Sequence, residues 1–396
     1  MLPRHARSAR SSGLAWSWLR LARVGGLTIV FLLLLDVTLA RHESRLEDEA
    51  WLGELRNAPG PAIADATRFM LLDTPPERRE RAIAMVGSSV TFGPRLAPDE
   101  TISAQLARWL AEKSPTRPVF NLAQPGGNPH TPIPVAAAFG THPVSLLLVE
   151  LLVPSYAEHE AAPLPALSTD EIAMLGEASP MQVQILRRCG ASPSASERIE
   201  TALTSVVRRA SRLYRLRGSL WWDSDFTPTY LVWSLRREIS EAGFLPKRFQ
   251  GQSTNVGRLP WRKAYVGGQR PGANQGFDLP TAALSEPNYA ELRCTAELAR
   301  AAGVPVIFFE LPLNLEFQRT FNLMQDQDFT HLNQVRRSLI ERMLSDGLDF
   351  LPAPELPEDG FLDKAHLTPL GARILAQHLG EAVLRQLSAG TKANTN

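Results

Sequence analysis

The sequence predicts an α/β fold built around a mainly parallel sheet, and two observations support this prediction. From residue 81 onward, short apolar runs typical of buried strands alternate with amphipathic stretches typical of helices. Parallel strands are joined by crossovers that are usually helices, so this alternation favours parallel pairing. The chain of 396 residues is also long enough to bury a sizeable core, which indicates one large domain or a domain with a long insertion.

The expected elements follow one another in strand–helix order. Strands are expected over residues 82–87, 118–123, 145–153 and 304–312, and helices over residues 102–113, 133–139, 289–303, 331–347 and 366–387. Thr368 and Pro369 form an N-cap and first-turn pair for the closing helix.

The alternation disappears between residues 155 and 285, and we interpret this part as an insertion over one end of the sheet. It is rich in arginine and tryptophan. The arginines at 208, 209, 212, 215 and 217 make one end of a helix basic, and a solvated face is favoured over contact with anionic lipid or polymer. The tail "GGQRPGANQG" lacks the lysine and hydroxyl residue of a phosphate-binding loop, so nucleotide binding is unsupported.

The N-terminus predicts a membrane anchor. Residues 1–23 are basic, and residues 24–40 are apolar except for Asp36. That length is near the lower limit for crossing a bilayer, and the positive-inside rule places the basic segment in the cytoplasm. We therefore expect a stalk over residues 41–80 and an extracytoplasmic domain over residues 81–390. A cleaved signal peptide ending at "TLA" is the alternative.

Charge and cysteine usage narrow the classes of function. A formal net charge of +1 gives no basic footprint, which disfavours nucleic acid as a partner. Cys189 and Cys294 have no metal-ligand spacing, and one disulfide in an oxidising compartment remains open. No cofactor and no metal is expected.

A serine-bearing turn follows the first expected strand. In "AMVGSSVTFG", residues 84–93, the apolar run stops at Gly87 and is followed by Ser88 and Ser89. Ligand crevices of parallel sheets lie at the carboxyl ends of the strands, so these hydroxyls are expected at the crevice. Backbone N–H groups of the next helix are candidate donors to an oxyanion.

A candidate base lies near the C-terminus, in "GFLDKAHLTPLG". Asp363 and His366 are three residues apart and come immediately before a helix. A carboxylate at this spacing can orient an imidazole whose other nitrogen accepts a proton from a serine. The alternative is that Asp363 is a loop or capping group and His366 a surface residue.

Taken together, three segments resemble blocks of the SGNH/GDSL hydrolase superfamily. "VGSSVTFG" resembles the first block, with Ser88 at the aspartate position and Ser89 at the nucleophile position. "FNLAQPGGNPHTP" resembles the second, with Gly126 as an oxyanion-hole donor, and "DKAHLTPLG" resembles the last. The resemblance covers residues 81–150 and 290–385. It implies a three-layer α/β/α sandwich and a catalytic triad of Ser89, His366 and Asp363.

The chain departs from that pattern in two places. The third block normally contributes an asparagine after the third strand, but "PSYAEHE" follows here. Asn128 is one candidate for the missing oxyanion donor, and Ser155 or a second backbone N–H are the others. Ser88 also replaces the aspartate of the first block, so simple secreted-esterase behaviour is not implied.

With the predicted anchor, these departures resemble a membrane-anchored acyltransferase branch that includes DltD-like and alginate-acetylation-type proteins. The resemblance implies serine-dependent O-acyl transfer, with acetyl as the expected group, or ester hydrolysis on a cell-envelope or exported polysaccharide. A multispanning membrane O-acyltransferase is the implied partner. The alternative is a catalytically inactive polymer-binding or scaffold domain.

Other polar residues are given lesser roles. His130 and His142 are interpreted as bystanders, and Glu150 as a paired or strand-end residue rather than a catalytic one. The tryptophans of the insertion are interpreted as packing residues, with stacking on a sugar ring as the alternative.

Overall fold

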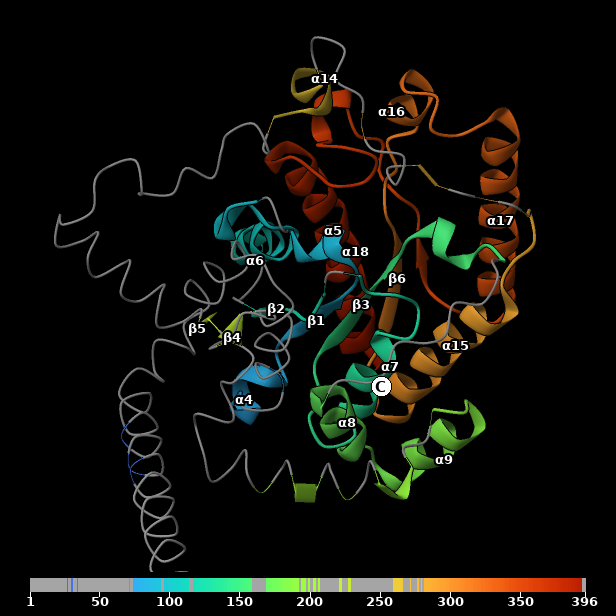
Figure 1. Ribbon diagram of the computed structural model, residues 1–396. Coiled ribbons are helices and arrows are strands. Elements are labelled where there is room, and N and C mark those ends of the chain that lie inside the picture. The colour runs from blue at the N-terminus through green and yellow to red at the C-terminus, as the bar shows by residue number, and fades with distance from the viewer. Residues whose placement is uncertain are drawn as a thin grey trace, which may run out of the picture.

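Figure 1 shows the computed structural model. The predicted cytoplasmic segment 1–23 and most of the predicted anchor 24–40, stalk 41–80 and insertion 155–285 lie outside the described residues. Within the part that is described, no helix combines the length and apolarity needed to cross a bilayer. The structure describes residues 74–93, 96–113, 117–124, 126–158, 169–191, 259–265 and 281–393, with isolated residues at 27, 30, 34, 71, 194–196, 199, 202–203, 206, 221–222, 227–228, 271, 276–277 and 279.

A five-stranded sheet with every neighbouring pair parallel forms the centre of the domain. Its order is β2-β1-β3-β6-β7. The strands are β1 (Ile83–Val86), β2 (Val119–Asn121), β3 (Leu146–Leu151), β6 (Val306–Glu310) and β7 (Phe350–Leu351). The predicted α/β fold with a parallel sheet is confirmed, while β7 was not predicted because two residues are too short to form an apolar run.

The central strands are apolar because they are covered on both faces. Every residue of β1 and β3 is buried, and the register pairs Ile83 with Leu146 and Val86 with Val149. Glu150 is the exception in this core, since it places a carboxyl group inside β3.

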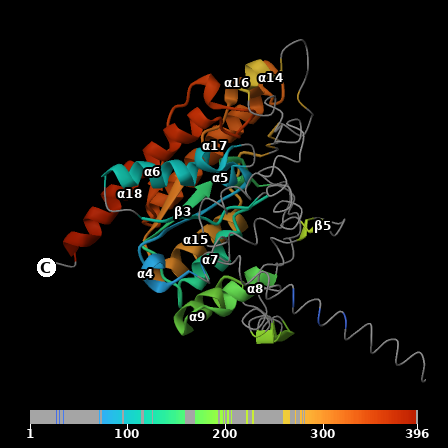
Figure 2. The ribbon, with the colours of Figure 1, turned by 90° about the vertical axis from the view of Figure 1, so that its left-hand side faces the viewer.

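Helices cover both faces of the sheet, an arrangement compatible with α/β/α layering (Figure 2). α6 (Ile102–Lys113) packs against α18 (Pro369–Ala393) on one face, and α7 (Pro132–Ala138) against α15 (Glu286–Ala301) on the other. A Cβ on Gly380 of α18 would lie 2.3 Å from the Trp109 ring of α6, so a glycine permits this close packing. α18 begins as predicted, with Thr368 Oγ1 accepting the Gly371 N–H at 3.3 Å.

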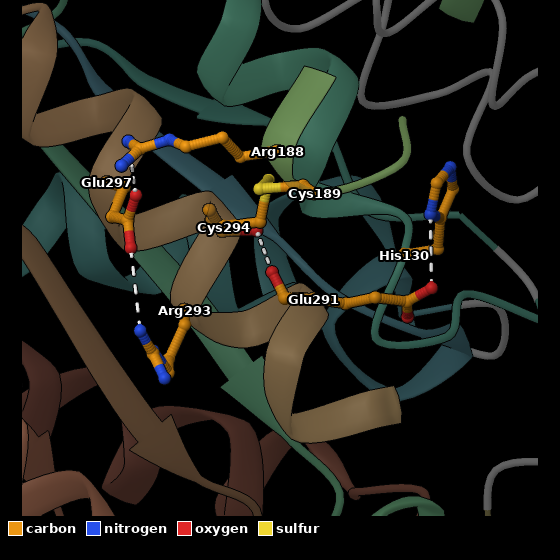
Figure 3. Close-up of a disulfide and its surroundings, with 8 residues drawn as sticks. His130, Arg188, Cys189, Glu291, Arg293, Cys294 and Glu297 are labelled. Carbon is orange, nitrogen blue, oxygen red and sulfur yellow. Dashed lines mark hydrogen bonds and ion pairs between the residues drawn. A yellow bond between two sulfur atoms is a disulfide. The ribbon is translucent and has the colours of Figure 1, made fainter. Parts of the chain in front are cut away.

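Part of the predicted insertion is helical and packs on the domain. α8 (Thr169–Gly176) lies against α7, and α9 (Pro180–Arg188) lies against α15. A disulfide joins Cys189, at the end of α9, to Cys294 of α15 (Figure 3).

The remaining elements of the described residues are α4 (Pro76–Arg79), α5 (Ser89–Phe92), η1 (Pro98–Glu100), η2 (Val153–Tyr156), β4 (Trp221–Trp222), β5 (Thr227–Pro228), α14 (Trp261–Ala264), α16 (Leu315–Thr320), α17 (Asp326–Ser345) and η7 (Glu358–Gly360).

The topology places a ligand crevice beside β1. The chain leaves β1 through α6 to reach β2, and leaves β2 through α7 to reach β3 on the other side of β1. Helices that leave neighbouring strands toward opposite faces open a crevice at the carboxyl ends of those strands. Ser88 and Ser89 follow β1 at this edge of the sheet, and η2 follows β3.

Candidate active site

The turn after β1 presents one of its two serines and buries the other. Ser88 is the N-cap of α5, is 8% exposed, and accepts the Val90 N–H with its Oγ at 3.3 Å. Ser89 is the first residue of α5 and is partly exposed. Gly93 ends the short helix in the left-handed conformation that glycine adopts easily, with φ of 78°. The two neighbouring hydroxyls therefore have different surroundings, and the Ser89 hydroxyl is the one that lies beside His366.

Ser89, His366 and Asp363 form one continuous hydrogen-bonded chain. Ser89 Oγ lies 3.0 Å from His366 Nε2. On the other side of the ring, His366 Nδ1 lies 2.9 and 3.0 Å from the two carboxylate oxygens of Asp363. These distances are within direct reach for proton transfer from a hydroxyl to an imidazole held by a carboxylate.

Asp363 is held as a carboxylate at the bottom of this chain. Its residue is 1% exposed, and Oδ1 also accepts the backbone N–H groups of Ala365 and His366 at 3.1 and 2.9 Å. Burial alone would raise the pKa of Asp363. The hydrogen bonds and charge attraction from His366, with those two backbone N–H groups, outweigh burial and lower its pKa from 3.8 to about 2.

The loop that carries Asp363 and His366 is fixed at both ends. Phe361 and Leu367 form a β-bridge, and the Leu362 N–H donates to the His366 carbonyl at 2.8 Å. Asn314, in the segment after β6, donates its Nδ2 to the Asp363 carbonyl at 3.1 Å. The imidazole is therefore positioned by backbone contacts as well as by its carboxylate.

The predicted oxyanion donors lie in the loop after β2. Asn128 lines a small pocket together with Gly87, Ser88, Gly127 and Ser155. Asn128 Oδ1 accepts from the His130 and Thr131 N–H groups at 3.0 and 3.2 Å, and in the described part of the chain no partner is recorded for its Nδ2. The side chain is thus oriented by its oxygen and keeps an amide donor for a ligand.

The second block contains two adjacent glycines in different settings. Gly126 has φ of 73°, is exposed, and has nothing within 4 Å of the position that a Cβ would take. A Cβ on Gly127 would lie 2.5 Å from the Gly87 carbonyl oxygen. Gly127 therefore packs against the nucleophile turn and lines the pocket, whereas Gly126 is absent from the pocket lining.

Two buried side chains that the sequence analysis did not assign to the site hold α5. Asn121 of β2 donates its Nδ2 to the Thr91 carbonyl at 3.0 Å, and Glu150 of β3 accepts the Thr91 N–H at 3.2 Å. The sequence did carry a signal for both residues, since each is a polar residue inside an apolar strand, and a buried polar group requires a hydrogen-bond partner.

The residues predicted to be bystanders are paired within the described structure. His130 Nδ1 lies 3.3 Å from Glu291 Oε1 of α15 (Figure 3), and His142 Nδ1 lies 2.7 Å from Thr141 Oγ1. Trp261 packs edge-to-face on Phe317 with ring centroids 5.6 Å apart and is 2% exposed, so this tryptophan is a packing residue. The side chains of Trp221 and Trp222 and the whole of Trp233 lie outside the described residues.

Comparison with known proteins does not assign this chain to a family. Neither the family models nor the curated proteins match this chain. Over the described residues, no three His, Cys, Asp or Glu side chains gather as a metal site would require.

Proposed function

We propose that this protein is an SGNH-type, serine-dependent O-acyltransferase or esterase that acts outside the cytoplasm on a cell-envelope or exported polysaccharide. The observation that carries the proposal is the Ser89–His366–Asp363 chain, with 3.0 Å between Ser89 Oγ and His366 Nε2. Such a chain activates a hydroxyl that is otherwise a weak nucleophile.

The proposed reaction has two steps. Ser89 Oγ attacks the carbonyl carbon of an ester and passes its proton to His366 Nε2. The ester C–O bond breaks, His366 returns the proton to the leaving alkoxide, and the acyl group stays on Ser89. An acceptor hydroxyl from water or a sugar then gives its proton to His366 and attacks the acyl carbon. The bond between the acyl group and Ser89 Oγ breaks, and His366 returns the proton to Ser89 Oγ, which restores the hydroxyl. Asp363 stays ionised throughout and stabilises the imidazolium.

The negative charge on the carbonyl oxygen needs donors during both steps. We assign this role to Asn128 Nδ2 and to the backbone N–H of Ser89, with Gly127 shaping the pocket beside them. Gly126, the donor implied by the family resemblance, does not line this pocket. Ser155 lines the same pocket and is the remaining side-chain candidate.

The disulfide supports the proposed extracytoplasmic location. The bond between Cys189 and Cys294 joins positions separated by 105 residues. Disulfides of this kind persist in oxidising compartments and are rare in the cytosol. An anchor over residues 24–40 would hold the domain at the membrane, next to a multispanning O-acyltransferase that supplies acyl groups.

A catalytically inactive polymer-binding or scaffold domain is the second candidate function. The observation in its favour is that the segment after β3, η2, carries no asparagine, so one donor of the resembled family is missing from its usual place. Loss of one oxyanion donor costs about 3–4 kcal/mol of transition-state stabilisation where nothing replaces it.

Labelling with a fluorophosphonate probe tests the proposal. We expect the full-length protein and Ser88→Ala to be labelled, and Ser89→Ala to be unlabelled, since the Ser89 hydroxyl lies beside His366 Nε2 whereas the Ser88 hydroxyl caps α5. Release of acetate from an O-acetylated polysaccharide should follow the same pattern. Absence of labelling in the folded, unsubstituted protein would reject the enzyme and favour the scaffold.

A further inference from the structure

Glu150 is a buried carboxyl group for which the proposed reaction has no use. It lies inside β3, the central strand of the sheet, and is 8% exposed. Its neighbours in the register are apolar, with Phe309 of β6 directly beside it. A charge without partners would be costly in this position, so its contacts should show why a glutamate is here.

The contacts of Glu150 converge on the turn that carries Ser89. Its Oε2 accepts the Thr91 N–H at 3.2 Å, and the same oxygen packs closely against Gly87. These two contacts stand on either side of Ser89 in the sequence. The carboxyl group therefore holds the turn at both ends and leaves the Ser89 side chain free for His366.

Gly87 allows this contact to form. A Cβ at Gly87 would lie 2.4 Å from Glu150 Oε2 and 2.7 Å from Glu150 Cβ, so only a glycine lets the carboxyl group pass this close to the backbone. Asn121 of β2 secures the other side of the same segment by donating to the Thr91 carbonyl at 3.0 Å. The turn is thus held between the two strands that flank β1.

The substitution of serine for aspartate in the first block gains a physical explanation. A carboxyl group at position 88 would stand beside Glu150, because both residues line the same small pocket, and two neighbouring buried acids disfavour each other's ionised form. With Ser88 in that place, an uncharged hydroxyl accepts the Val90 N–H. Burial raises the pKa of Glu150, and the hydrogen bonds from Ser88 and Thr91 oppose that rise.

We infer that Glu150 is a positioning residue, which holds the Gly87–Thr91 turn so that Ser89 Oγ stays within hydrogen-bond distance of His366 Nε2. The inference deepens the proposed function and rests on it for the predicted effect on rate. Misplacement of a nucleophile by about 1 Å can cost about 100-fold in rate, so a loosened turn should slow the chemistry without weakening substrate binding.

The test compares Glu150→Met and Glu150→Gln with the unsubstituted full-length protein. Methionine has similar size and no acceptor, while glutamine keeps one acceptor oxygen. We expect at least about a 10-fold lower rate constant of fluorophosphonate labelling for Glu150→Met, a smaller loss for Glu150→Gln, and full labelling at the end point for both. With an ester substrate, kcat should fall and KM should stay within about twofold.

Gln182→Met is the matched control. Gln182 is a fully buried polar residue of α9 that donates to the Ala136 and Leu298 carbonyls, away from the turn. We expect this variant to be less stable and to label at the unsubstituted rate. If Glu150→Met instead labels at the unsubstituted rate with a reduced end point, Glu150 only supports folding and the inference fails.

An NMR measurement separates this inference from the proposed function. If the unsubstituted protein is not labelled, the proposed enzyme activity fails, and the imidazole nitrogen resonances of His366 then decide the positioning role. They should shift in Glu150→Met, because the hydrogen bond from Ser89 is lost, and should stay unchanged in Gln182→Met. Unshifted resonances in folded Glu150→Met would overturn the inference.

Discussion

Ser89 Oγ and His366 Nε2 lie 3.0 Å apart although 277 residues separate the two side chains. Ser89 follows β1 and His366 follows β7, and two strands, β3 and β6, stand between β1 and β7 in the sheet. The segment after β7 ends in a loop that is closed by the hydrogen bond from the Thr368 N–H to the Gly360 carbonyl, and Asp363 within this loop orients the imidazole.

Replacing Asp363 with asparagine should slow labelling of Ser89 by roughly 10²–10⁴-fold. The amide keeps the size of the side chain but loses the charge that orients Nδ1 and stabilises the imidazolium. The measurement is the rate constant of fluorophosphonate labelling. Asp359→Asn, which changes an exposed aspartate of η7 just before that loop, is the control that should label normally. Equal rates for both variants would exclude Asp363 from the reaction.

Acid should remove stability that Asp363 contributes. Its pKa is about 2 in the folded protein and 3.8 ordinarily, so the folded state favours the ionised form. The contribution is fully present above about pH 4 and is lost as pH falls toward 2; it amounts to about 2 kcal/mol. The free energy of unfolding of the protein and of Asp363→Asn should therefore converge between pH 5 and pH 2. A difference that is constant with pH would contradict the assignment.

Asn128→Asp should distinguish the structural role of the Asn128 side-chain oxygen from the proposed donor role of its Nδ2. Aspartate keeps the oxygen that accepts from His130 and Thr131, so the turn should be preserved, but it removes the Nδ2 donor. We expect a fall in kcat of about 10²–10³-fold with little change in the melting temperature. Ser155→Ala, in the same pocket, should have a smaller effect. A larger loss in Ser155→Ala would move the donor role to Ser155.

Removing the disulfide should destabilise the domain. The Cys189→Ser, Cys294→Ser double variant should lose about 2–5 kcal/mol in the free energy of unfolding, measured with urea, because the bond closes a long loop in the unfolded chain. Reductant should lower the stability of the unsubstituted protein and leave the double variant unchanged. Alkylation of two thiols in unreduced, denatured protein purified from its oxidising compartment would show that the bond is absent.

Much of the fold followed from local pattern. The buried strands β1, β2, β3 and β6 and the helices α6, α7 and α15 were predicted to within a few residues, whereas α18 ends six residues beyond the expected residue 387. The strands could be predicted because strands covered on both faces read as continuous apolar runs. β7 was missed, since two residues give no periodicity. α8 and α9 were also not separated from the arginine-rich segment around them.

The candidate site was predicted less completely from the sequence than the fold, and its residues differ in how strongly the sequence indicated them. Ser89, His366 and Asp363 were identified from short motifs and their order. Gly126 was predicted as a donor, and the close contact of the adjacent Gly127 with the Gly87 carbonyl could not be predicted, because the two glycines are equivalent in the sequence. Glu150 was predicted to be a paired or strand-end residue, and its partner Thr91 could not be named because the two residues are 59 positions apart.

The sequence by itself determined the alternation of strands and helices and the residue types able to carry acyl chemistry, since periodicity and turn chemistry are local properties. Only the tertiary structure decided which of the two serines meets the imidazole, which way Asn128 points, and what a carboxyl group does in the middle of β3. Those answers depend on contacts between distant segments, and distance in the folded chain is set by how the sheet packs rather than by spacing along the polypeptide.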